Sequence, residues 1–214
     1  MNISSVRKRY DWYSRFYDKF EQPMEQMVFR DLRSLIIGAL KGKILEVGVG
    51  TGKNIQYYQS HTQVIGVDIS PNMLKKAKQK ISSFHGNKIE LKLMDAEELS
   101  FKDETFNIVL CTFVLCSVPN PANAIQEMLR VLRSRGRLIL LEHVLSKMSL
   151  IAYLQKIANP FTRGIFGFNI DRDTLEILKQ ENVLILKDQN LTKTDILKFL
   201  VCEKPNQKIV DGNP

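Results

Sequence analysis

The strongest constraint on this chain is a glycine-rich turn that follows a short apolar run. Residues 43–54 read KILEVGVGTGKN, and residues 64–71 read VIGVDISP. The first run ends in three glycines, Gly48, Gly50 and Gly52, as in a buried parallel strand whose backbone turns sharply. The second run ends in Asp68, sixteen residues after Gly52. Two parallel strands joined by a helix would place Gly52 and Asp68 at the same carboxyl edge of a sheet, where ligands of open α/β sheets bind.

The spacing of the glycines argues against a phosphate-binding loop. A dinucleotide site has the pattern G-x-G-x-x-G, and its third glycine would fall on Lys53. A P-loop requires a glycine where Val47 stands and a hydroxyl residue where Asn54 stands. We therefore expect neither a pyrophosphate nor a triphosphate at this turn.

Acidic residues follow three of the predicted strands. Glu46 lies in the turn region, where it would repel a pyrophosphate but attract an ammonium group. Asp68 can accept hydrogen bonds from both hydroxyls of a ribose. Asp95, followed by Ala96, ends a third apolar stretch and could accept from an adenine amino group. Three such acids without a phosphate cradle favour S-adenosylmethionine over NAD, FAD or ATP.

Four segments carry a family resemblance. LEVGVGTG, VIGVDISPNML, LMDAEEL and GRLILLEHV resemble the class I S-adenosylmethionine-dependent methyltransferases, over roughly residues 10–142 and more loosely beyond. Within that class the chain is most similar to the quinone-biosynthesis C-methyltransferases, the bacterial phospholipid N-methyltransferases and the membrane-associated thiol methyltransferases. The resemblance implies that the last strand is antiparallel. The expected cofactor-binding residues are Glu46, Gly48, Gly50, Gly52, Asp68, Ile69, Met73, Asp95, Ala96, Cys111 and Thr112.

The order of apolar runs predicts a Rossmann-like fold, a doubly wound, seven-stranded and mostly parallel sheet with helices on both faces. The strands are expected near residues 43–47, 64–68, 89–94, 106–110, 137–141, 183–187 and 197–203. The helices are expected near 24–40, 53–59, 71–84, 121–132 and 171–180. We divide the chain into a helical segment 1–40 that forms a lid or faces a membrane, a cofactor-binding domain 41–204 and a loose tail 205–214.

Composition sets wider limits. A chain of 214 residues is long enough for one domain with a full core. Its net charge of +8 suits a negative partner, although many basic proteins use such an excess only for solubility. Three cysteines without a C-x-x-C pair or a signal peptide lead us to expect a reduced cytoplasmic setting and no metal site. Because no apolar run approaches ~18 residues, we expect that the protein, if it meets a membrane, lies on the inner face and does not cross it.

The first twenty residues combine aromatic and basic side chains. The aromatics are Tyr10, Trp12, Tyr13, Phe16, Tyr17 and Phe20, and cations surround them. Such a helix suits an anionic membrane interface, a lid over the active site, or ordinary packing on the core, and the sequence leaves all three open. As a lid, it would allow Tyr13 and Tyr17 to bind a cationic amine or the sulfonium by cation–π contact, and we name both as candidate catalytic residues.

Residues 144–170 form an unusually long connection. They contain no acidic residue, three basic ones and many apolar ones. In the methyltransferases that the chain resembles, this region shapes the acceptor pocket, so an apolar and basic cover predicts a small lipophilic acceptor, with or without an anionic group. The alternative is an extra helix that packs on the core. Arg172, just beyond, could hold a phosphate or pair with Asp171 or Asp173.

Methyl transfer from a sulfonium is an in-line displacement, so the protein mainly positions the acceptor and excludes water. His143, at the end of the fifth strand, is the candidate general base, although a lone histidine there is often a hydrogen-bonding core residue. The favoured acceptor is a phospholipid head-group amine, followed by a thiol and then a quinone carbon. An RNA methyltransferase and a non-catalytic cofactor-binding regulator are further hypotheses. Nucleic acid is disfavoured because no RNA-binding module is recognisable. The sequence predicts no oligomeric state.

Overall fold

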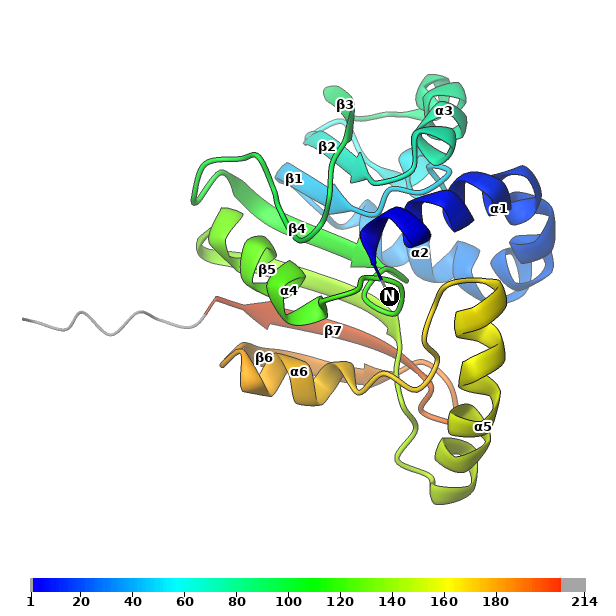
Figure 1. The fold of residues 1–214 in the computed structure, drawn as a ribbon. Coiled ribbons are helices and arrows are strands. Elements are labelled where there is room, and N and C mark those ends of the chain that lie inside the picture. The colour runs from blue at the N-terminus through cyan, green and yellow to red at the C-terminus, as the bar shows by residue number, and fades with distance from the viewer. Residues whose placement is uncertain (1, 205–214) are drawn as a thin grey trace, which may run out of the picture.

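The computed structural model describes residues 2–204, apart from the side chains at positions 20, 24 and 28. Its centre is a seven-stranded sheet in the order β3-β2-β1-β4-β5-β7-β6, with helices on both faces (Figure 1). This confirms the predicted fold class. The tail predicted to be loose, residues 205–214, lies outside the described residues.

Five strands are parallel, and the site lies at the carboxyl ends of the first four. They are β1 Gly42–Val47, β2 Thr62–Asp68, β3 Lys88–Leu93, β4 Phe106–Thr112 and β5 Leu132–His143. In the register of the sheet, Val47 at the end of β1 pairs with Val67 on one side and with Cys111 on the other. The glycine turn after β1 is therefore flanked by Asp68 and Thr112, as the order of the runs predicts.

Two strands close the sheet on the far side. β6 Leu184–Asn190 and β7 Leu197–Glu203 are antiparallel to each other, and β7 is also antiparallel to β5. The antiparallel last strand implied by the family resemblance is thus confirmed.

The helices are α1 Ile3–Met24, α2 Arg30–Gly38, α3 Pro71–Gln79, α4 Pro121–Val131, α5 Ser149–Ile165 and α6 Thr174–Gln180. Pro23 lies inside α1, and a π-helical turn, Glu25–Phe29, separates it from α2. α3 begins as expected: Pro71 occupies the first turn, and the Ser70 hydroxyl accepts from the Met73 amide at 3.1 Å.

The helix predicted over residues 53–59 is wrong. Only a short 3₁₀ turn, Ile55–Tyr57, forms there, and Tyr58 has an extended backbone with ψ 139°. The Tyr58 hydroxyl donates to Glu46 Oε2 at 2.8 Å, and Asn54 Nδ2 donates to Glu46 Oε1 at 2.7 Å. These bonds to a buried carboxylate favour the extended conformation at Tyr58 over another helical turn.

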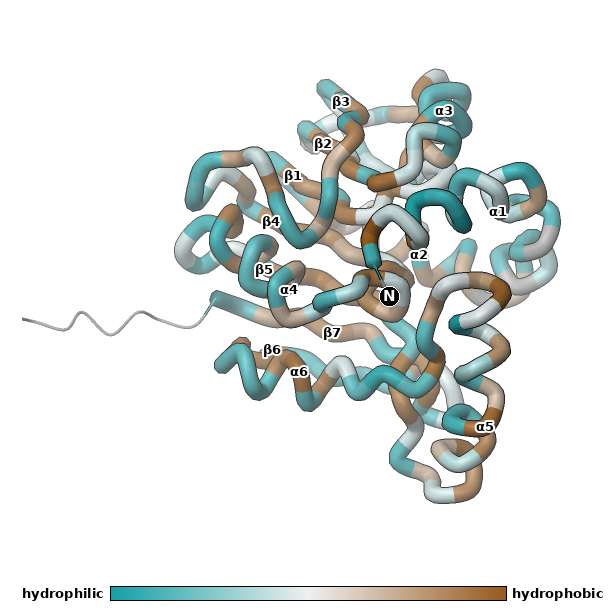
Figure 2. Tube along the Cα trace, viewed as in Figure 1, coloured by the Kyte–Doolittle hydropathy of each residue, from teal (hydrophilic) through white to brown (hydrophobic). Residues whose placement is uncertain are grey.

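The core lies on both faces of the sheet because neighbouring strand residues point to opposite sides. Ile44 of β1 belongs to the cluster that contains Ile37 of α2. Leu45, the next residue, belongs to the larger cluster with Ile125 of α4 and Leu178 of α6. Figure 2 shows the corresponding concentration of hydrophobic residues along the central strands. The two covered faces leave the strand ends as the place where a ligand can enter.

Candidate active site

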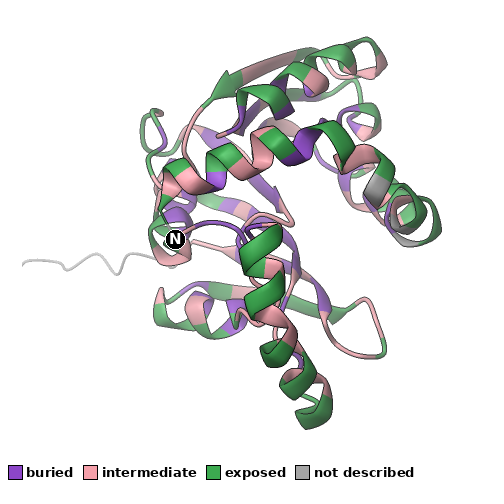
Figure 3. Ribbon diagram, turned by 45° about the vertical axis from the view of Figure 1, so that its right-hand side comes forward, coloured by how far each residue is buried: buried purple, intermediate pink, exposed green. Residues whose placement is uncertain are grey.

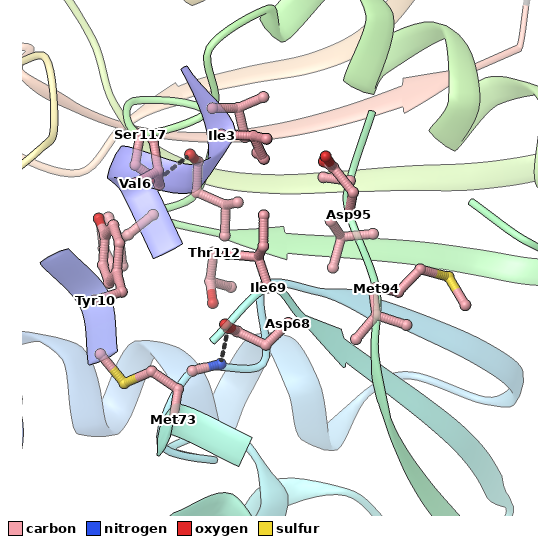
Figure 4. Close-up of a pocket in the computed structure, with 18 of the residues that line it drawn as sticks. Ile3, Val6, Tyr10, Asp68, Ile69, Met73, Met94, Asp95, Thr112 and Ser117 are labelled. Atoms are coloured by element: carbon pink, nitrogen blue, oxygen red, sulfur yellow. Dashed lines mark hydrogen bonds between the residues drawn. The ribbon is translucent and has the colours of Figure 1, made fainter. Parts of the chain in front are cut away.

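A cavity opens at the carboxyl ends of β1, β2, β3 and β4, beneath α1 (Figure 4). The empty space inside it is about 680 Å³, with the open solvent at its mouth included. The predicted residues that line it are Gly48, Gly50, Asp68, Ile69, Met73, Asp95, Ala96, Thr112 and Tyr17. Glu46, Gly52, Cys111, Tyr13 and His143 lie outside this lining.

The glycine turn brings bare backbone to the cavity wall. Gly48 has a φ of +71°, and its amide donates to the Val67 carbonyl at 2.8 Å. A Cβ at Gly48 would lie 2.1 Å from Val114 Cγ2, so a side chain is excluded by both conformation and space. The Gly50 amide donates to Asp68 Oδ2 at 2.8 Å. The turn and the acid after β2 are therefore locked together at the cavity.

Asp68 is held in a fixed orientation by backbone amides. Besides the bond from Gly50, its Oδ1 accepts from the Ser70 amide at 2.8 Å. Burial raises the pKa of Asp68 to about 6, and the backbone donors of Ser70 and Gly50 oppose that rise. The carboxylate is ionised at neutral pH, and each oxygen retains a lone pair. It can therefore accept from a pair of ligand hydroxyls.

Glu46 does not face the cavity. Its two oxygens accept from Tyr58 and Asn54, and the side chain is almost fully buried. Burial raises the pKa of Glu46 to about 7. Asn54 Nδ2 also reaches Thr112 Oγ1 at 3.2 Å, and Thr112 lines the cavity. In this geometry Glu46 supports the floor of the site through Asn54.

Gly52 and Cys111 also serve packing. Gly52 has a φ of +78°, and a Cβ there would meet the backbone of Ala77 in α3 at 3.0 Å. The Cys111 thiol is buried and donates to Glu142 Oε1 at 3.3 Å. Burial and the neighbouring Glu142 raise the pKa of this thiol well above its ordinary value. It is therefore protonated at neutral pH and is no nucleophile.

α1 forms the roof of the cavity. Val6, Tyr10 and Tyr17 line it, and their spacing of four and seven residues places them on one helical face. Figure 4 shows Val6 and Tyr10. The acids of α1 bind the turn and helix below: Asp11 Oδ1 accepts from Ser70 Oγ at 2.5 Å, and Asp18 Oδ1 accepts from Thr51 Oγ1 at 2.6 Å. The inward face of α1 thus lines the cavity, while the choice between a lid, a membrane contact and ordinary packing stays a prediction.

The two candidate tyrosines have different surroundings. Tyr17 lines the cavity, and Lys53 Nζ lies 4.9 Å from the centre of its ring. Tyr13 packs behind it, with ring centroids 5.2 Å apart, and against Phe166 at 5.6 Å. Burial raises the pKa of both phenols, to about 12 for Tyr13. Both are therefore neutral at physiological pH.

His143 lies beside the cavity wall and not on it. The centroid of its ring is 5.0 Å from that of Phe113. His143 is the last residue of β5, where it pairs with Leu197 of β7. Burial lowers the pKa of His143, and the charge of Glu21 and a hydrogen bond with the backbone of Ile196 oppose this. The imidazole is therefore neutral at pH 7. It packs against Phe113, which lines the cavity while His143 does not, so its role as a general base stays a prediction.

Sequence reasoning missed the groups that hold the loop after β4. Glu142 Oε1 accepts from the amides of Val114 and Leu115 at 2.9 and 3.1 Å. From the other side, Arg172 Nη1 donates to the carbonyls of Leu115 and Val118, the latter at 2.7 Å. Arg172 thus binds loop carbonyls where a phosphate or its acidic neighbours were expected. The sequence shows Glu142 at the end of a strand and Arg172 after a long connection. It does not show that both side chains bind the backbone of the same loop.

The lining fits an adenosyl sulfonium. Asp68 suits the ribose hydroxyls, Asp95 and Ala96 lie at the end of the next strand, and Ile69, Met73 and Met94 supply apolar walls for a purine. The Gly48 turn leaves room for close backbone approach. Within residues 2–204, no group of three or more His, Cys, Asp and Glu side chains could hold a metal ion. None of the helices in the described part of the chain has the length and apolar character to cross a membrane.

Comparison with known proteins gives the family. Residues 45–140 match the model of a methyltransferase domain. The chain is 31% identical over 188 residues to a phosphatidylethanolamine N-methyltransferase of Cereibacter sphaeroides, covering 84% of this chain and 92% of that protein. It is 29% identical over 183 residues to a human thiol S-methyltransferase, covering 84% of this chain and 75% of that protein.

A solved S-adenosylmethionine-dependent methyltransferase from Methanosarcina mazei superposes with a TM-score of 0.63 at 26% identity, covering 77% of this chain and 92% of that one. Together with the geometry of the cavity, these similarities identify the ligand of the strand ends. The chain belongs to the S-adenosylmethionine-dependent methyltransferases, and S-adenosylmethionine is its methyl donor.

Proposed function

We propose that this enzyme methylates the head-group amine of a phospholipid. The observation that carries the proposal is the match in length as well as sequence to the phosphatidylethanolamine N-methyltransferase of Cereibacter sphaeroides, of which the chain covers 92%. The thiol S-methyltransferases of human and rat are matched over only 75% and 67% of their length. A lipid acceptor also agrees with the apolar connection of residues 144–170.

The site residues supply binding and orientation. S-adenosylmethionine, when bound, brings an already activated methyl group, so the protein needs to place the acceptor nitrogen in line with it. Asp68 and the backbone at Gly48 and Gly50 would hold the donor. Tyr10 and Tyr17 roof the cavity with aromatic rings whose phenols stay protonated, because burial raises the pKa of each. Such rings can attract the ammonium of a head group by cation–π contact.

An acceptor panel tests this proposal. The full chain and S-adenosylmethionine are mixed with phosphatidylethanolamine in detergent micelles, a small thiol, a demethylated quinone or total RNA, and S-adenosylhomocysteine is measured. Phosphatidylcholine in the same detergent is the matched control, because its nitrogen is fully methylated and has no free electron pair. We expect turnover with phosphatidylethanolamine and none with phosphatidylcholine. Turnover with only the thiol, the quinone or the RNA would refute the lipid acceptor.

One observation favours a thiol as the second candidate. Among the described residues that line the cavity there is no histidine, and His143 packs behind Phe113. A thiol ionises near neutral pH without a base, whereas a protonated amine must lose a proton before it attacks. With a thiol acceptor, the rate would rise with pH through the pKa of the thiol itself. A quinone C-methyltransferase of Geotalea daltonii is also a relative, at 25% identity over 67% of its length, but a carbon acceptor needs a proton removed and the described cavity lining has no histidine. Membership of a methyltransferase family argues against a regulator without turnover.

A further inference from the structure

α5 turns its apolar side away from the protein. Six large apolar residues, Leu150, Tyr153, Leu154, Ile157, Phe161 and Ile165, recur at spacings of three and four, so they share one helical face. Their exposed fractions lie between 52% and 71%. No residue of α5 is buried. Figure 3 shows exposed residues along nearly the whole helix, which stands off from the sheet.

The inner side of α5 is attached by polar groups. Gln155 Nε2 donates to the carbonyls of Val144 and Ile170 at 3.0 and 2.7 Å. Asn159, four residues on, accepts from the Ile170 amide at 3.0 Å. A helix that packed on the core would bury its apolar face and expose these amides. In α5 the amides face the protein and the apolar residues face solvent. An exposed apolar surface of this kind is typical of an interaction site.

The outward face of α1 continues this surface. Trp12 and Phe16 are 58% and 53% exposed, on the side of α1 opposite to Asp11 and Asp18. The two helices touch: Arg9 Nη1 donates to the Arg163 carbonyl at 2.5 Å, and the rings of Tyr13 and Phe166 are 5.6 Å apart. Exposed apolar residues of α5 and exposed aromatics of α1 therefore lie on neighbouring helices, and α1 also lines the cavity.

The charges around this surface indicate which kind of partner binds there. The exposed cations beside the apolar residues are Lys8, Arg15 and Lys19 on α1 and Lys147, Lys156 and Arg163 on or next to α5. Residues 143–170 contain no acidic side chain. A second copy of this chain would set cations against cations, whereas an anionic lipid surface offers opposite charge and an apolar interior. We propose that the outward faces of α5 and α1 dock this enzyme on an anionic bilayer.

This docking goes beyond the proposed acceptor and can be tested without it. The full chain is mixed with vesicles of phosphatidylcholine alone or with phosphatidylglycerol, and neither lipid has the amine of phosphatidylethanolamine. Trp12 is the single tryptophan of the sequence and lies on the proposed surface, so its emission reports the contact. We expect stronger retention by the anionic vesicles, a blue shift of Trp12 emission, and quenching by brominated lipid.

Paired variants locate the surface. The variant Leu154→Ser with Phe161→Ser changes two exposed apolar residues of α5 and is expected to weaken vesicle binding by roughly tenfold or more. Its control, Leu184→Ser with Leu186→Ser, changes two exposed apolar residues of β6 and should bind as the wild type does.

A second pair of variants tests the charges. Lys156→Glu with Arg163→Glu should abolish the preference for anionic vesicles, whereas Lys75→Glu with Lys78→Glu, the same change of charge on the exposed side of α3, should retain it. Equal binding to both kinds of vesicle by the wild type would overturn the proposal. So would a dimer that the α5 variants dissociate while vesicle binding stays unchanged, because α5 would then be an interface between copies of the chain.

Discussion

Gly48 is constrained by both its backbone conformation and the space around it. Its φ is +71°, and a Cβ would lie 2.1 Å from Val114 Cγ2. We expect Gly48→Ala to lower the free energy of unfolding by about 1–3 kcal/mol and to weaken donor binding, because the cavity wall must shift. Gly164→Ala is the matched control, since a Cβ there meets nothing within 4 Å. Urea unfolding and calorimetric titration compare the two, and equal stability would contradict the role of Gly48.

Single residues show how far the sequence could lead. Asp68 was predictable because a polar residue at the end of a buried strand must reach the ligand edge. The positions of Glu46 and Cys111 outside the cavity wall were not predictable. Both lie in strands that are buried on both faces, and the sequence does not say toward which face each side chain points. Tyr10 was missed for a related reason: the aromatic pattern predicts a helix, but its rotation over the cavity depends on contacts with distant residues such as Ser70.

Among the elements, the loop between β4 and α4 depends on Arg172. This guanidinium donates to the carbonyls of Leu115 and Val118. We expect Arg172→Met to destabilise the fold by about 1–3 kcal/mol and to raise the KM for the donor, because Val118 lines the cavity. Arg30→Met, at an exposed position, is the control. An unchanged KM together with a normal unfolding midpoint would show that Arg172 does not position the loop.

The α1 roof is held partly by Asp18, which accepts from Thr51 and pairs with Lys80 at 3.2 Å. Asp18→Asn removes the charge at low steric cost. We expect trypsin to cleave α1 of this variant at Arg15 or Lys19 several-fold faster than in the wild type, because the roof opens more often. Saturating S-adenosylmethionine should restore protection. Cleavage at the wild-type rate would mean that Asp18 does not hold the roof closed.

The helices and strands show which features of the fold follow from local sequence and which depend on tertiary contacts. All seven strands were predicted near their observed positions because short β-runs between turns are local signals, although β5 begins at Leu132, five residues before the predicted start. The helix predicted over residues 53–59 was not observed, because the Tyr58 hydroxyl donates to the buried carboxylate of Glu46, which lies outside that segment. The apolar spacing in residues 149–165 indicates a helix, but the same spacing would suit a core helix. Only the tertiary contacts of Gln155 show that the apolar side points outward.

At the scale of the whole molecule, buried carboxyls make stability depend on pH, and Glu46 and Glu142 add to the effect of Asp68, whose pKa burial raises to about 6. Burial raises the pKa of Glu46 and of Glu142 to about 7. An acid whose folded pKa is raised binds its proton more tightly in the native state, so its contribution is present at low pH and is lost as pH rises through the folded pKa. We therefore expect the free energy of unfolding to fall between about pH 4.5 and about pH 7, the ordinary and the folded pKa of the two glutamates.

Glu142→Gln isolates one of these contributions. Oε2 of Glu142 is buried without a hydrogen-bond partner, so the ionised form is costly there. The variant cannot ionise, and we expect it to lose on the order of 2 kcal/mol less stability than the wild type over that pH range. Urea unfolding at several pH values measures this difference. Parallel curves for the wild type and the variant would show that Glu142 keeps an ordinary pKa in the folded protein.

S-adenosylmethionine at the carboxyl ends of the strands, with Asp68 as a direct partner, is the basis of the proposed activity. Isothermal titration of the donor into the wild type and into Asp68→Ala tests this most directly. The account predicts saturable binding to the wild type and a loss of about 1–3 kcal/mol in the variant, the magnitude of a lost hydrogen bond to a charged group. Undiminished affinity in a folded Asp68→Ala protein would contradict it.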